Sequence, residues 1–191
     1  MFLEKLIVSM KISYFFCIIL MLSVVNLWSV GTRWFKDVFL MVNILVFLST
    51  LLFWVLYNKL TVGLQFVSSF TIPLGSIDWV VNFGLNGFSM FFVILTSFLI
   101  CICIFISYEK TYKCEEFNFL LWILQLILFV FFMTDDLIVF FMCFEMCLVP
   151  IFLIILTWGS SVRRVLASYY FFIYTGIGAI LMILGICLII M

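Results

Sequence analysis

The chain of 191 residues contains no histidine, and only 9% of its residues are charged. The lack of histidine excludes a metal or haem held by imidazole and any catalytic mechanism that uses histidine as its base. Nine basic and nine acidic residues cancel, so there is no excess positive charge for binding nucleic acid. The sequence also lacks a glycine-rich phosphate loop and a cluster-binding cysteine pattern, and we therefore expect no cofactor in this chain.

The seven cysteines do not form a metal-binding pattern. They occur at positions 17, 101, 103, 114, 143, 147 and 187, and most lie within apolar runs. Cys143 and Cys147 are four residues apart and share a helix face, but no further thiol cluster accompanies them. Buried cysteine usually behaves as a small hydrophobic residue, so we predict neither a metal site nor a disulfide.

Apolar residues dominate what is present: 69% of the chain is hydrophobic, and the mean hydropathy is +1.46. A water-soluble fold of this length cannot bury so much apolar surface, because it also needs a polar exterior. The composition predicts an integral membrane protein, with residues 1–191 forming one membrane domain in contact with lipid. No small-residue cleavage site follows the first apolar run, so we expect no cleavable signal.

Six apolar runs are long enough to cross a bilayer, and the expected fold is an all-α integral membrane protein with six transmembrane helices. The runs cover residues 12–30, 38–57, 88–108, 117–133, 137–156 and 166–190. The connection between the second and third runs, residues 58–87, has an Ile-Pro-Leu-Gly turn at Pro73 between two partly alternating segments. This pattern predicts a short external β-hairpin, and Trp79 suggests that the hairpin rests on the membrane surface or on a partner.

The basic residues predict how the chain is oriented. The loops after the first, third and fifth runs hold six of them: Arg33, Lys36, Lys110, Lys113, Arg163 and Arg164. The opposite side holds the other three: Lys5, Lys11 and Lys59. Because basic residues are enriched in loops on the inner side, we expect the larger set inside and the N-terminus and hairpin outside.

The run at residues 137–156 has one carboxylate, Glu145, close to its middle. A helix of this length spans roughly 30 Å, which places Glu145 near the bilayer midplane, where an acid costs about 2.5–3.5 kcal/mol. Pro150 has no N–H, so it leaves the carbonyl of Met146 without a helical partner and favours a kink. We predict a functional role for Glu145, with Pro150 and Met146 as possible supporting residues. The alternative is a neutral, hydrogen-bonded glutamic acid that only locks helix packing.

Gln125 is central in the preceding run, so it and Glu145 could face each other and Gln125 could support the site. For a lone amide in a membrane helix, hydrogen bonding between helices is a more typical role than proton handling.

Two stretches resemble a known family. Residues 140–159, FFMCFEMCLVPIFLIILTWG, are followed by two arginines and then by YFFIYT at residues 170–175. Together they resemble the antiporter-like membrane subunits of respiratory complex I, and among these the family of the fourth mitochondrially encoded subunit and bacterial chain M. Residues 83–99, FGLNGFSMFFVILTSFL, look like this family's third-helix opening, but Asn86 stands where the family generally has aspartate. The resemblance covers residues 80–191, and the earlier part matches in layout only.

The resemblance implies a multi-pass subunit of NADH:ubiquinone oxidoreductase in the mitochondrial inner membrane. Such a subunit contributes to proton translocation by an enzyme complex, beside other membrane-arm subunits, without itself performing redox catalysis. Glu145 matches the family's glutamate on helix five, and the resemblance therefore implies that Glu145 takes part in proton transfer. The family's lysines on helices seven, eight and twelve have no counterpart here. Because the family has about fourteen helices, we expect either that a second polypeptide supplies the rest or that the subunit is reduced. The alternatives are a subunit of a multisubunit Na⁺/H⁺ antiporter and a purely structural membrane subunit.

Overall fold

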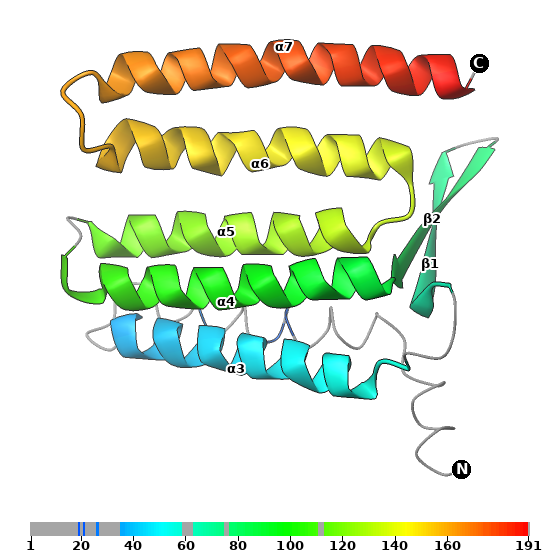
Figure 1. Cartoon of the computed structure of the whole chain (residues 1–191), viewed down its shortest axis with the longest axis horizontal. Coiled ribbons are helices and arrows are strands. Elements are labelled where there is room, and N and C mark those ends of the chain that lie inside the picture. The colour runs from blue at the N-terminus through cyan, green and yellow to red at the C-terminus, as the bar shows by residue number, and fades with distance from the viewer. Residues whose placement is uncertain are drawn as a thin grey trace.

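A computed structural model describes residues 19, 21, 26, 35–58, 63–74, 77–110 and 113–190. Five long helices lie side by side, each antiparallel to the next (Figure 1). They are α3 (Phe35–Leu56), α4 (Gly87–Lys110), α5 (Cys114–Met133), α6 (Leu137–Trp158) and α7 (Arg164–Ile190). Two strands, β1 (Gln65–Leu74) and β2 (Ile77–Leu85), connect α3 to α4.

All five helices are long and apolar enough to cross a membrane, which confirms a multi-pass membrane protein. The expected first span, residues 12–30, lies almost wholly outside the described residues, so the total of six helices stays a prediction. The ends of the helices differ from the predicted ends of the apolar runs by at most three residues. For example, α3 begins at Phe35 rather than at residue 38, because its first turn tolerates the charged residues Lys36 and Asp37 at the edge of the apolar run.

The structure confirms the hairpin within residues 58–87, but Pro73, expected in the turn, lies in β1 opposite Asp78. The strands pair antiparallel, with Phe70 opposite Val81, and the register shifts between Gln65 and Ser68. At this irregularity Phe66 has a φ of +58°, which is rare for a bulky side chain. The ring of Phe66 packs edge-on against Phe53 of α3, with centroids 5.5 Å apart. An isolated two-stranded hairpin is marginally stable, so this packing against the helices matters for the hairpin.

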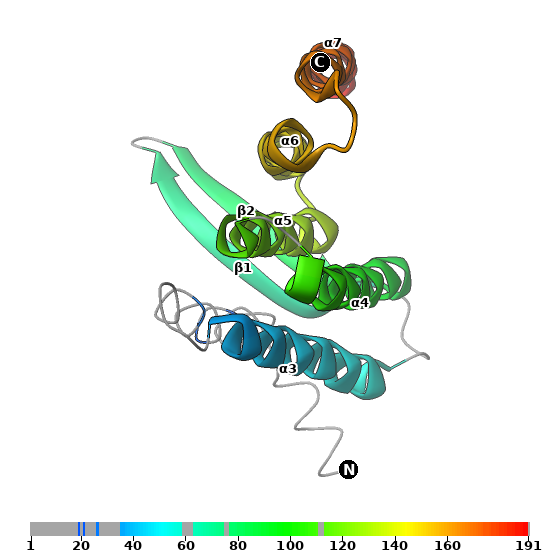
Figure 2. The ribbon, with the colours of Figure 1, turned by 90° about the vertical axis from the view of Figure 1, so that its left-hand side faces the viewer.

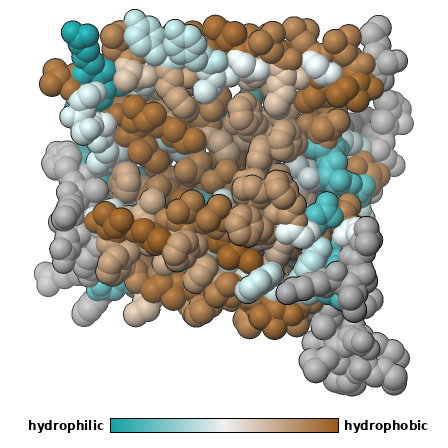
Figure 3. Space-filling view, viewed as in Figure 1, coloured by the Kyte–Doolittle hydropathy of each residue, from teal (hydrophilic) through white to brown (hydrophobic). Residues whose placement is uncertain are grey.

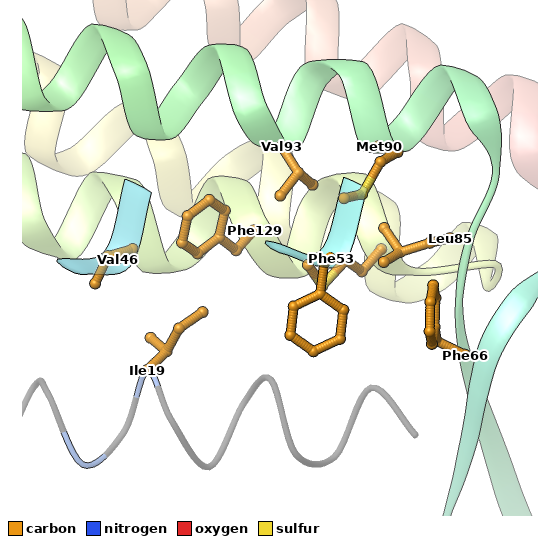
Figure 4. Close-up of a cluster of buried hydrophobic side chains, with 9 residues drawn as sticks. Ile19, Val46, Phe53, Phe66, Leu85, Met90, Val93 and Phe129 are labelled. Carbon is orange, nitrogen blue, oxygen red and sulfur yellow. The ribbon is translucent and has the colours of Figure 1, made fainter. Parts of the chain in front are cut away.

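The core lies between α3, α4 and α5 and has two parts. The part near the hairpin is drawn in Figure 4 and joins Ile19, Val46, Phe53, Phe66, Leu85, Met90, Val93, Phe129 and Met133. The part near the other end of the helices joins Phe35, Phe39, Ile100, Ile104 and Leu121. Two hydrogen bonds also tie these helices together: Thr50 to Ser97 at 3.0 Å, and Ser107 to Asn118 at 2.9 Å.

Helices α6 and α7 extend from this core one after the other, so that among the described helices α7 packs mainly beside α6 (Figure 2). In the apolar part of each helix, 6% of the residues of α7 are buried, compared with 33% for α3 and for α4. Apolar residues cover most of the molecular face in Figure 3, while hydrophilic residues gather towards the two ends of the helices. Such a surface suits contact with lipid or with other membrane helices.

The fold separates the loops into two sets. Lys36, Lys113, Arg163 and Arg164 lie at one end of the helices, and the hairpin lies at the other end with the α5–α6 turn (Figure 1). The predicted orientation can therefore be tested with two exposed positions. In sealed vesicles, a membrane-impermeant maleimide should label Val162→Cys only from the inside and Val80→Cys only from the outside. The wild-type chain, with its native cysteines, sets the background. Labelling of Val162→Cys from the outside would reverse the orientation.

Candidate functional site

Helix α6 begins at a capping residue that also contacts the hairpin. The Oδ1 atom of Asp136 accepts a hydrogen bond from the backbone N–H of Ile138 at 2.8 Å, which makes Asp136 the N-cap. Its second oxygen, Oδ2, accepts a hydrogen bond from Nε1 of Trp79 at 2.9 Å. Both oxygens of one carboxylate are thus in use, one for the helix and one for β2.

The backbone before α6 follows the edge of β2. Thr134 forms an isolated antiparallel bridge with Phe83, and the N–H of Asp135 donates to the carbonyl of Asn82 at 3.1 Å. Together with the hydrogen bond from Trp79 to Asp136, these bonds hold the turn between α5 and α6 beside the hairpin. The α5–α6 turn therefore behaves as a short extension of the sheet.

Within α6, Glu145 lies on an exposed face. The helix is continuous through Pro150, which is buried, as are Cys143 and Cys147. Glu145 is exposed, together with Met146 next to it. The exposed residues Met142 and Val149 lie three positions before and four positions after Glu145, on the same side of the helix. Glu145 therefore points away from the core of α3, α4 and α5.

The part of α7 level with Glu145 is open. Phe152 contacts Tyr169 and Phe172 of α7, with ring centroids 5.8 and 5.7 Å apart. Glu145 precedes Phe152 by seven residues, about two helical turns, and α7 runs antiparallel to α6. The level of Glu145 thus falls near Gly176 and Gly178, where no atom lies within 4 Å of an added Cβ.

Gln125 does not accompany Glu145. It is 2% exposed and lies between Leu121 and Phe129, which belong to the two parts of the core. Helix α6 packs on another side of α5, where Phe131 stacks on Phe140 with centroids 4.3 Å apart. The structure buries Gln125 and exposes Glu145, so it does not bring the two side chains together. The Nε2 atom of Gln125 is buried and has no hydrogen-bond partner in the described part of the chain.

The sequence reasoning missed the bond between Trp79 and Asp136. Trp79 was expected to contact the membrane surface or a partner, and 57 residues separate it from Asp136 in the sequence. The one available signal was aspartate directly before a long apolar run, which is typical of a helix N-cap. As for metals, no three Cys, Asp or Glu side chains gather into a possible site among the residues that the structure describes.

A pair of substitutions tests the burial of Gln125. Gln125→Met removes an amide that has an unpartnered buried Nε2, so thermal stability in mild detergent should stay unchanged or rise. Asn118→Leu, on the same helix face, removes the bond to Ser107 and should destabilise the protein by about 0.5–1.5 kcal/mol. Thermal unfolding of both purified variants measures the difference. A clear loss of stability in Gln125→Met would mean that its amide is bonded.

Comparisons with known proteins give a family match over the region that holds Glu145. Residues 134–191 match a family model described as "NADH:quinone oxidoreductase/Mrp antiporter, TM". Over longer stretches the chain is similar to curated proteins named "NADH-ubiquinone oxidoreductase chain 4". The Marchantia polymorpha protein is 36% identical over 157 residues, which cover 81% of this chain and 31% of the relative. The Arabidopsis thaliana protein is 37% identical over 150 residues, which cover 77% of this chain and 30% of the relative. The Metridium senile protein is 41% identical over 121 residues, which cover 57% of this chain and 25% of the relative. The chain thus spans under a third of the length of these relatives.

Proposed function

Because this chain belongs to the family of chain 4 of NADH-ubiquinone oxidoreductase, we propose that it helps to translocate protons in the membrane arm of that complex. The mitochondrial inner membrane is the compartment that this role implies. Within the complex, the chain would carry protons and leave the reactions of NADH and quinone to other subunits, so it needs no cofactor of its own.

The observation that carries the proposal is the position of Glu145. It is the only charged residue within α6, and it lies in the region matched by the family model. Measured along the helix axis, Glu145 lies about 12 Å from the start of α6, which is well inside a hydrocarbon layer of about 30 Å. An ionisable residue at such a depth is expensive to keep and is by default a functional candidate.

The exposure of Glu145 supports a protein partner on this face. An acid facing lipid at this depth costs about 2.5–3.5 kcal/mol, so other helices should cover it in the assembled complex. The covered face would comprise Glu145 with Met142 and Val149 of α6, beside the open positions Gly176 and Gly178 of α7. We propose that further helices of the subunit pack here, beside other membrane-arm subunits. If the subunit is split, as one of the two expectations from the sequence has it, these helices belong to a second polypeptide.

The chemistry at this site is a change of protonation. A lysine from the covering helices, within about 4–6 Å of Glu145, would favour the carboxylate form, and withdrawal of that charge would favour the protonated form. Movement of one positive charge can therefore make Glu145 release or take up a proton. The residues of this chain supply the acid, its depth in the membrane and a helix that Pro150 makes easier to bend at the next turn.

Two other functions remain distinguishable from this one. The matching family model also names the Mrp antiporter, but the curated relatives are chain 4 of the oxidoreductase, which favours the respiratory complex. In a purely structural subunit, Glu145 would be a protonated packing residue. This last alternative makes a different prediction for substitution of the acid.

Glu145→Gln keeps the size and hydrogen-bonding capacity of the side chain but removes its titration. The complex should assemble at its normal level and should pump fewer protons per electron, measured in sealed vesicles during NADH oxidation. Glu115→Gln, at the exposed start of α5, is the matched control and should pump normally. A normal proton-to-electron ratio in assembled Glu145→Gln complex would decide for the structural alternative.

Coverage of the Glu145 face can be measured by photo-crosslinking. A photoreactive side chain at Val149, which is 53% exposed and one turn after Glu145, should crosslink to protein in the assembled complex. Mass spectrometry of the product should identify helices that correspond to the unmatched part of the relatives. Crosslinks to lipid alone would contradict the proposed partner.

A further inference from the structure

We propose that Trp79 is a positioning residue for Glu145, acting from the hairpin through Asp136 and the start of α6. This inference rests on the proposed role of Glu145 and adds the element that sets its depth in the membrane. Trp79 contacts Asp136, nine residues before Glu145, and is thus a positioning residue rather than a catalytic one.

The first step is the double use of the Asp136 carboxylate. Oδ1 caps α6 through the N–H of Ile138, and Oδ2 holds the indole N–H of Trp79. Because the carboxylate is rigid and planar, the first turn of α6 cannot slide along its axis without stretching the bond to Trp79. The backbone bond from Asp135 to Asn82 acts in the same sense.

The second step is that the hairpin is itself anchored. At its base, Leu85 is 1% exposed and Phe66 is 8% exposed, and both pack into the core with Met90 and Met133 (Figure 4). The side-chain oxygen of Gln65 also accepts from the backbone N–H of Asn58, at the end of α3, at 3.0 Å. The hairpin therefore gives α6 a reference point fixed to α3, α4 and α5.

The third step is the direction from which Glu145 is held. Glu145 follows Asp136 by nine residues, or about 14 Å of helix. Pro150 removes the N–H that would bond the carbonyl of Met146, so the turn after Glu145 lacks one helical bond. The segment that carries Glu145 is thus tied more firmly to its start than to its end. A shift at Asp136 would be passed to Glu145 along the intact part of the helix.

The contact can be removed from either side without removing the cap. Trp79→Phe keeps an aromatic ring and loses the N–H donor. Asp136→Ser keeps an N-cap oxygen for Ile138 and loses the acceptor for Trp79. Trp54→Phe, on the exposed face of α3, is the matched control for loss of an indole.

The measurement is the pH profile of proton translocation by the assembled complex, with NADH oxidation recorded in parallel. Trp79→Phe should assemble and should shift the midpoint of the profile by at least about half a pH unit, a threefold change in proton affinity. Asp136→Ser should give a similar shift, and the double variant should give no more than either single variant, because all three remove the same bond. Trp54→Phe should match the wild type.

The outcomes separate this inference from the proposed function. A wild-type pH profile in Trp79→Phe and Asp136→Ser, with pumping lost in Glu145→Gln, overturns the positioning role alone. Normal pumping in Glu145→Gln overturns the proposed function itself. Failure of both Trp79→Phe and Asp136→Ser to assemble, while Trp54→Phe assembles, shows a contact needed only for folding and also overturns the positioning role.

Discussion

Inside the hydrocarbon layer there is no water to hydrogen-bond a backbone N–H or C=O, and each segment that crosses it must satisfy these groups by itself. Because of this constraint, the five described apolar segments form helices, and the described strands lie at the end of the bundle, in the hairpin. The constraint also explains why polar side chains within the helices bond to a neighbouring helix or to their own backbone, as Thr50 does with Ser97 and with the carbonyl of Phe47. Among the described residues, neither kind of partner is found for Glu145 or for the Nε2 atom of Gln125.

The helices divide into a packed group and an open group. Large apolar side chains from α3, α4 and α5 meet in the core, whereas α6 and α7 form an extension with exposed sides (Figure 2). The relatives are more than three times as long as the part that matches this chain. The open sides of α6 and α7 agree with this, because further helices in the relatives could pack there. The packed group supports the hairpin, the hairpin holds the start of α6, and α6 presents Glu145 on the open side.

The sequence predicted the features that depend on local pattern. Apolar runs near residues 38–57, 88–108, 117–133, 137–156 and 166–190 became helices, and two paired strands formed within residues 58–87. Pro73, which was expected in the turn between them, lies within β1. The sequence did not predict which way each helix faces, because helices that are apolar on all sides give little information on rotation. For this reason Gln125 was expected near Glu145, yet it lies in the core. The bond from Trp79 to Asp136 was equally hidden, since it requires the relative placement of a hairpin and a turn far apart in the chain.

That separation also has a consequence for the order of events during synthesis. Trp79 leaves the ribosome 57 residues before Asp136, so the strand that will receive the start of α6 exists before the helix does. The indole N–H of Trp79 and the carbonyl of Asn82 are therefore synthesised before the residues at the start of α6 to which they bond.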